Sequence, residues 1–171
     1  KTSQTHLILG FRAYSADHKD NATLSVLAGV LGGGMSSRLF HRIRDQLGAG
    51  YYIKSDLDVF TDHGYLAIYT GVDNKRVSEI LEAILVEVSL IKNNPVSDEE
   101  LKKVKNYLIG NLFASVETSS ARAQFYGLDE ALGKKLRTPK EYAAEIQAVS
   151  VKDVERIAKN IFKTQKVNLS L

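Results

Sequence analysis

A glycine-rich segment, residues 32–52, constrains the fold of this chain more than any other stretch. Glycine is destabilising inside a helix and tolerates positive φ angles, so the triplet at 32–34 predicts the end of one helix. The residues that follow are compatible with a short amphipathic helix over 36–47, and Gly48 is expected just after its end. The apolar stripe of that helix is formed by Leu39, Phe40, Ile43 and Leu47. A strand that begins with two tyrosines, 51–52, comes next.

Hydrophobic periodicity predicts the remaining elements. Alternation places Leu7, Leu9, Phe11 and Ala13 on one face of a first strand, 5–13. The other predicted strands are 51–60, 64–72 and 166–171, and the turn Asp62-His63-Gly64 joins the first two of them. Helical spacing predicts a helix that ends at Leu31 and a mainly helical second half, with apolar stripes over 77–91, 101–112 and 154–161 and a helix-compatible segment over 121–131.

Capping residues mark the helix starts. Either Asp20 or Asn21 is expected to accept backbone N–H bonds in the first turn of its helix, and Ser36 in that of the next. Capping boxes are predicted for Ser97 with Glu100 and for Thr138 with Glu141, and Ser150 with Asp153 is expected to open the last helix.

The resulting order of elements implies an α+β fold. We expect a two-layer sandwich in which a largely antiparallel sheet is covered on one face by helices. No linker-like stretch or internal repeat interrupts residues 1–171, so a single domain is predicted.

Composition excludes several classes of function. The chain has no cysteine, which rules out disulfides, thiolate metal sites and cysteine nucleophiles. Its net charge is only +3 and its basic residues are spread out, so nucleic-acid binding is not expected. No apolar run approaches the ~20 residues of a membrane span, so we expect a soluble protein, with the cytoplasm as the default compartment. Because the chain begins at Lys1, we expect it to be a piece of something longer.

Known catalytic motifs are absent. The four histidines, His6, His18, His41 and His63, lack the spacing of H-x-x-E-H or its inversion. Neither a phosphate-binding loop nor a nucleophile elbow is present. The carboxylate pairs at 56/58 and 99/100 are explained by solvation and by the helix dipole. We therefore predict no metal or cofactor site in this chain.

Arg44 and Tyr51 remain as candidate site residues. They are seven residues apart at one end of the helix-to-strand turn, and Arg44 falls at the edge of the apolar stripe while Arg38 points away. A guanidinium and a phenol that converge there could donate to a carbonyl oxygen or to an oxyanion. Alternatively, Arg44 pairs with a carboxylate or caps carbonyls, and Tyr51 packs in the core. Strand parity favours the second interpretation, since Tyr51 shares a face with Ile53, Leu57 and Val59.

Three groups of residues resemble a known family. They are L-G-G-G-M-S-S-R-L-F at 31–40, I-R-D-Q-L-G at 43–48 and Tyr51, and the similarity extends from Leu9 to Val154. Together they resemble the C-terminal homologous domain of insulinase/pitrilysin-type zinc metallopeptidases, which include mitochondrial processing peptidase.

The resemblance implies a division of labour between two similar halves that enclose a peptide. An N-terminal homologous domain or subunit would carry H-x-x-E-H and zinc, and this chain, which has no zinc of its own, would not hydrolyse peptides unaided. By the same motif, Arg44 and Tyr51 would reach into the partner's active site and hold the peptide substrate. Three alternatives stay open: a proteolytically inactive structural or peptide-binding relative, a freestanding ligand-binding domain, and a homodimer.

Overall fold

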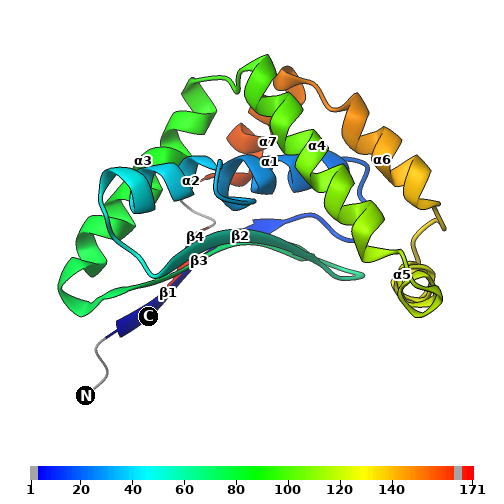
Figure 1. Ribbon diagram of the computed structural model, residues 1–171, viewed down its shortest axis with the longest axis horizontal. Helices are drawn as coiled ribbons and strands as arrows, with labels where there is room; N and C mark the ends of the chain where they lie inside the picture. Colours follow the sequence, from blue (N-terminus) through cyan, green and yellow to red (C-terminus); the bar gives the residue numbers. More distant parts are fainter. Residues whose placement is uncertain (1–3, 164–166) are drawn as a thin grey trace.

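A four-stranded antiparallel sheet forms one layer of the computed structural model, and helices form the other (Figure 1). The structure describes residues 4–163 and 167–171. The helices gather on one face of the curved sheet, whose opposite face they leave uncovered (Figure 1). This arrangement confirms the predicted α+β sandwich.

The strands are paired in the order β2-β3-β1-β4, so β2 and β4 lie at the two edges. Their bounds are β1 Gln4–Ala13, β2 Tyr52–Val59, β3 Gly64–Asp73 and β4 Val167–Ser170. All three pairings are antiparallel. Leu7, Leu9 and Phe11 are buried beneath the helices, as alternation predicts. Of the predicted last strand, Lys166 lies outside the described residues.

The helical layer is built around α1, which is buried along nearly its whole length rather than on a single stripe. The elements of this layer are α1 Asn21–Gly32, α2 Arg38–Phe40, η1 His41–Gln46, η2 Asn74–Arg76, α3 Val77–Asn93, α4 Asp98–Ser115, α5 Ser119–Ala131, α6 Pro139–Ala148 and α7 Val151–Ile161. Gly32 ends α1 against β2, where a Cβ atom would lie only 2.4 Å from the backbone nitrogen of Ser55. Glycine is thus required for this close approach.

The predicted helix over 36–47 divides into the short helix α2 and the π-helix η1. Its N-cap is Ser37, not Ser36, and the Ser37 hydroxyl donates to the carbonyl of Gly34 at 2.6 Å rather than capping the helix. Arg38, expected to point away from the apolar stripe, forms an ion pair with α4. Its guanidinium donates to both carboxylate oxygens of Glu100, at 2.7 and 2.8 Å. Since Glu100 is engaged by Arg38, the box predicted with Ser97 forms only in its Ser97 half.

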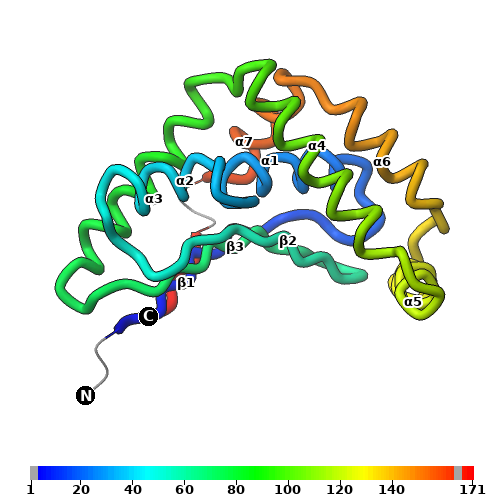
Figure 2. The backbone as a smooth tube through the Cα atoms, viewed as in Figure 1, coloured from blue at the N-terminus to red at the C-terminus, as the bar shows by residue number. Residues whose placement is uncertain are grey.

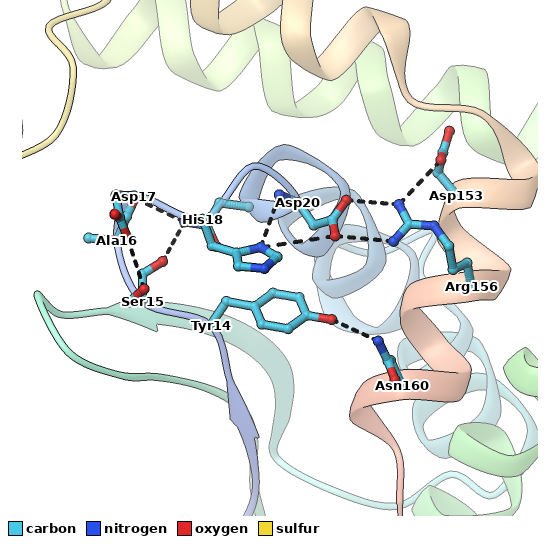
Figure 3. A network of polar contacts seen from close by, with 10 residues as sticks. Tyr14, Ser15, Ala16, Asp17, His18, Asp20, Asp153, Arg156 and Asn160 are labelled. Carbon is cyan, nitrogen blue, oxygen red and sulfur yellow. Dashed lines mark hydrogen bonds and ion pairs between the residues drawn. The ribbon is translucent and has the colours of Figure 1, made fainter.

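The predicted Asp20 cap is likewise not formed by the side chain. Instead, Arg156 of α7 donates to both oxygens of Asp20, at 2.8 and 3.1 Å (Figure 3). His18 accepts from the Asp20 backbone N–H and stacks on Tyr14 with ring centroids 3.8 Å apart, and Asn160 donates to the Tyr14 hydroxyl (Figure 3). Arg156 holds the pKa of Asp20 below its usual range. This network fixes the start of α1 to α7.

The box predicted at Thr138 with Glu141 forms, and Ser150 and Asp153, expected to open the last helix, do so through a capping box of their own. Among the helices of the described ranges, none is long and apolar enough to cross a membrane.

Candidate functional site

The candidate residues flank a glycine turn that joins the helical layer to the sheet. Arg44 lies in η1, and Tyr51 comes directly before β2. Gly48 and Gly50 take positive φ angles of 57° and 77°, which side chains disfavour. In Figure 2 the cyan part of the tube descends through this turn towards the sheet. The sequence thus folds here as a tight reversal that only glycine permits at low cost.

Arg44 closes the turn from the helix side. Its Nη1 donates to the carbonyl of Gly50 at 2.6 Å and to that of Tyr51 at 3.2 Å. The residue is nevertheless exposed, and no carboxylate of residues 4–163 or 167–171 pairs with it. The structure therefore shows Arg44 as a cap of backbone carbonyls, which is one of the arrangements that the sequence left open. Since those two bonds use a single nitrogen, they leave other guanidinium N–H groups for a ligand.

Tyr51 does not pack in the core, contrary to strand parity. Its side chain is 58% exposed, whereas Ile53 is buried. Parity fails because β2 begins at Tyr52, one residue after Tyr51. The Tyr51 backbone N–H donates to the carbonyl of Gly71 at 2.7 Å, which holds the residue at the end of β3.

The neighbouring phenol is in different surroundings. The Tyr52 hydroxyl lies 3.1 Å from Nδ1 of His6. A Cβ atom at Gly71 would lie 2.8 Å from the Tyr52 ring, so this ring rests on the glycine. Tyr52 is thus engaged with the sheet, whereas Tyr51 projects from it.

Arg44 and Tyr51 line one cavity of about 370 Å³. The lining also includes Asp73, at the end of β3, and Arg76, in the helical turn η2. Sequence reasoning missed Arg76. The antiparallel pairing of β2 with β3 could have found it, because that pairing brings the end of β3 beside the start of β2.

The Arg76 guanidinium forms hydrogen bonds with groups of the protein itself. Its Nε and Nη2 donate to the two oxygens of Glu79 at 2.7 and 2.8 Å. The same Nη2 donates to the backbone carbonyl of Leu47 at 3.0 Å. These hydrogen bonds from Arg76 lower the pKa of Glu79.

A second cavity, of about 550 Å³, runs beside edge strand β2. Residues 53–57 of β2 form one side of it, and the end of α1 with part of α4 forms the other. Met35, which is 80% exposed, and Tyr107 contribute apolar surface.

The described part of the chain does not fit a metal ion. It contains no group of three or more histidine, cysteine, aspartate or glutamate side chains placed to bind one. Each histidine has a separate partner: His6 meets Tyr52, His18 meets Asp20, His41 meets Asp45 and His63 meets Asp62.

Comparison with known proteins relates the chain to one protein family. The family model of the peptidase M16 inactive domain matches residues 1–108. An uncharacterized zinc protease of Bacillus subtilis, YmxG, is 33% identical over 162 residues, which are 95% of this chain and 40% of the relative. Another, Rv2782c of Mycobacterium tuberculosis, is 31% identical over 92% of this chain and 36% of its own length. The chain thus spans well under half the length of these relatives.

Solved structures share the fold. A protease from Helicobacter pylori superimposes with a TM-score of 0.89 at 21% identity, over 98% of this chain and 40% of that one. The peptidase M16 inactive domain from Pseudomonas fluorescens gives 0.88, also at 21% identity and with the same coverage.

Proposed function

This chain belongs to the peptidase M16 family as an inactive domain, and from that membership we propose that it is the substrate-holding half of a zinc-dependent endopeptidase. A second, homologous half would bind zinc, which activates the attacking water. The observation that carries the proposal is the exposure of Arg44 and Tyr51 on one cavity. The described residues, which offer no metal site, fit a supporting half.

The state of Arg44 suits such a role. Two carbonyls of the turn bind one nitrogen of the guanidinium, so its orientation is fixed before a peptide arrives. A fixed cation needs little reorganisation when charge develops on a peptide oxygen. In this proposal Arg44 donates to the substrate carbonyl or to the oxyanion that it becomes.

Tyr51 would supply the second donor. A phenol donates one O–H bond and is neutral at pH 7. The Tyr51 main chain is held by its backbone bond to Gly71, while the residue stays 58% exposed. The pair thus offers two donors of different kinds to one substrate.

Edge strand β2 supports a peptide as the class of substrate. Its outer side has no partner strand within the described sheet, and the 550 Å³ cavity lies beside it. Extended peptides bind such edges through main-chain hydrogen bonds.

The variant Arg44→Ala tests the proposal in the complete protein with its zinc-bearing half. Loss of one donor to a developing oxyanion costs on the order of 10²–10³ in kcat, and we expect a loss of that size in a peptide-cleavage assay. Arg42→Ala is the matched control, because Arg42 lies in the same π-helix and its Nη1 donates to the side-chain oxygen of Gln46 at 2.7 Å.

Normal cleavage by Arg44→Ala would contradict the proposed role. If the complete wild-type protein binds peptides and cleaves none, the chain belongs instead to a proteolytically inactive, peptide-binding relative.

A further inference from the structure

Arg76 bridges two segments that meet at the glycine turn. Its guanidinium reaches from η2, at the end of β3, to the carbonyl of Leu47 at the end of the π-helix that carries Arg44. Given the proposed function, on which this inference rests, we propose that Arg76 is a positioning residue that holds the turn between Arg44 and Tyr51 in its working conformation.

The Leu47 carbonyl is a group that needs an external donor. Carbonyls in the last turn of a helix have no partner further along the helix. A cation placed there also interacts favourably with the negative end of the helix dipole. Arg76 meets both requirements with a single N–H, at 3.0 Å.

The turn is thereby held from two sides. Arg44 binds the carbonyls of Gly50 and Tyr51 from the helix, and Arg76 binds that of Leu47 from the sheet end. Between these contacts the backbone passes through two glycines, which have the greatest conformational freedom of any residue. Loss of either contact therefore removes one of the restraints on the turn between the two proposed donors.

Glu79 fixes the orientation of the Arg76 guanidinium. It receives both Nε and Nη2 of Arg76, which fixes the plane of the guanidinium. Lysine has no planar fork, so it cannot satisfy Glu79 in this way and reach Leu47 with the same geometry.

A double-mutant cycle tests the proposal in the complete protein with its zinc-bearing half. We expect Arg76→Gln to lower kcat about three- to tenfold, the loss expected from one ordinary hydrogen bond, with KM changed less than twofold. Arg76→Lys should give an intermediate kcat. In the Arg44→Ala background, Arg76→Gln should cost less than in the wild-type background, because part of its effect passes through Arg44.

Hydrogen exchange supplies a readout that is independent of cleavage. In the complete protein, Arg76→Gln should speed amide exchange across residues 41–52 and leave strand β1 unchanged. Arg156→Gln is the stability control, because it breaks a distant ion pair and should leave kcat unaltered.

Two results would overturn the inference: a kcat for Arg76→Gln within twofold of wild type, or an equal loss in the Arg44→Ala background. These are distinguishable from failure of the proposed function, in which Arg44→Ala itself cleaves normally.

Discussion

At the scale of single residues, two adjacent tyrosines have different surroundings. Tyr52 rests on Gly71 and meets His6, whereas Tyr51 projects beside Arg44. Their chemical identity makes each the natural control for the other.

We predict that Tyr51→Phe lowers kcat of the complete, zinc-bearing protein on the order of 10²–10³, as for loss of an oxyanion donor. Tyr52→Phe should stay within about twofold of wild type, because its hydroxyl bonds to a side chain of the sheet. Peptide-cleavage kinetics for both variants check the prediction, and equal losses would contradict it.

Individual side-chain partners were the least predictable part of the site. The position of Arg44 and Tyr51, seven residues apart, was enough to nominate them as candidates. Strand parity wrongly predicted a buried Tyr51, because the sequence alone did not show that β2 begins one residue later. The contact of Arg76 with the turn had no local signal, since the Leu47 carbonyl that it binds is 29 residues away.

At the scale of elements, glycines decide how closely helix and sheet approach. Gly32 allows α1 to end against the backbone of β2, and a Cβ atom there would meet the Ser55 nitrogen at 2.4 Å. The contact is with backbone, so no side-chain rotation relieves it.

Gly32→Ala should lower the free energy of unfolding by about 1–3 kcal/mol, the usual cost of overpacking a core. Gly110→Ala is the control. Gly110 lies inside α4 with no atom within 4 Å of a built Cβ, so alanine should raise stability by about 0.5–1 kcal/mol. Urea unfolding of both variants measures the difference, and a neutral Gly32→Ala would contradict the account.

Element order could be read from the sequence because hydrophobic periods of 2 and 3.6 residues persist over most of the chain. The π-helix could not be read, because it differs from an α-helix only in hydrogen-bond register. The Asp20 cap failed for another reason: its carboxylate is taken by Arg156, 136 residues away.

At the scale of the whole molecule, the bond between Asp20 and Arg156 joins the start of α1 to the last helix (Figure 3). Arg156 holds the pKa of Asp20 below its usual value of 3.8. A carboxyl group whose pKa is lowered by folding stabilises the fold above the unfolded pKa, and this contribution is lost as pH falls through the folded one.

Arg156→Gln should therefore lower the melting temperature by about 1–4 °C at pH 7, as expected for a partly exposed ion pair. The difference from wild type should shrink below pH 4 and vanish once Asp20 is protonated. Lys159→Gln, which breaks a pair within α7 alone, should cost less at pH 7. Thermal unfolding across this pH range checks the prediction, and a difference that does not shrink as the pH falls below 4 would contradict it.

The exposed edge of the sheet has a consequence for the protein during synthesis. An unpaired strand is a template for intermolecular pairing and aggregation. Three of the eight residues of β2, Lys54, Asp56 and Asp58, are charged. In-register parallel pairing of β2 with a second copy would place like charges beside one another, so these side chains disfavour that mode of self-association at the edge.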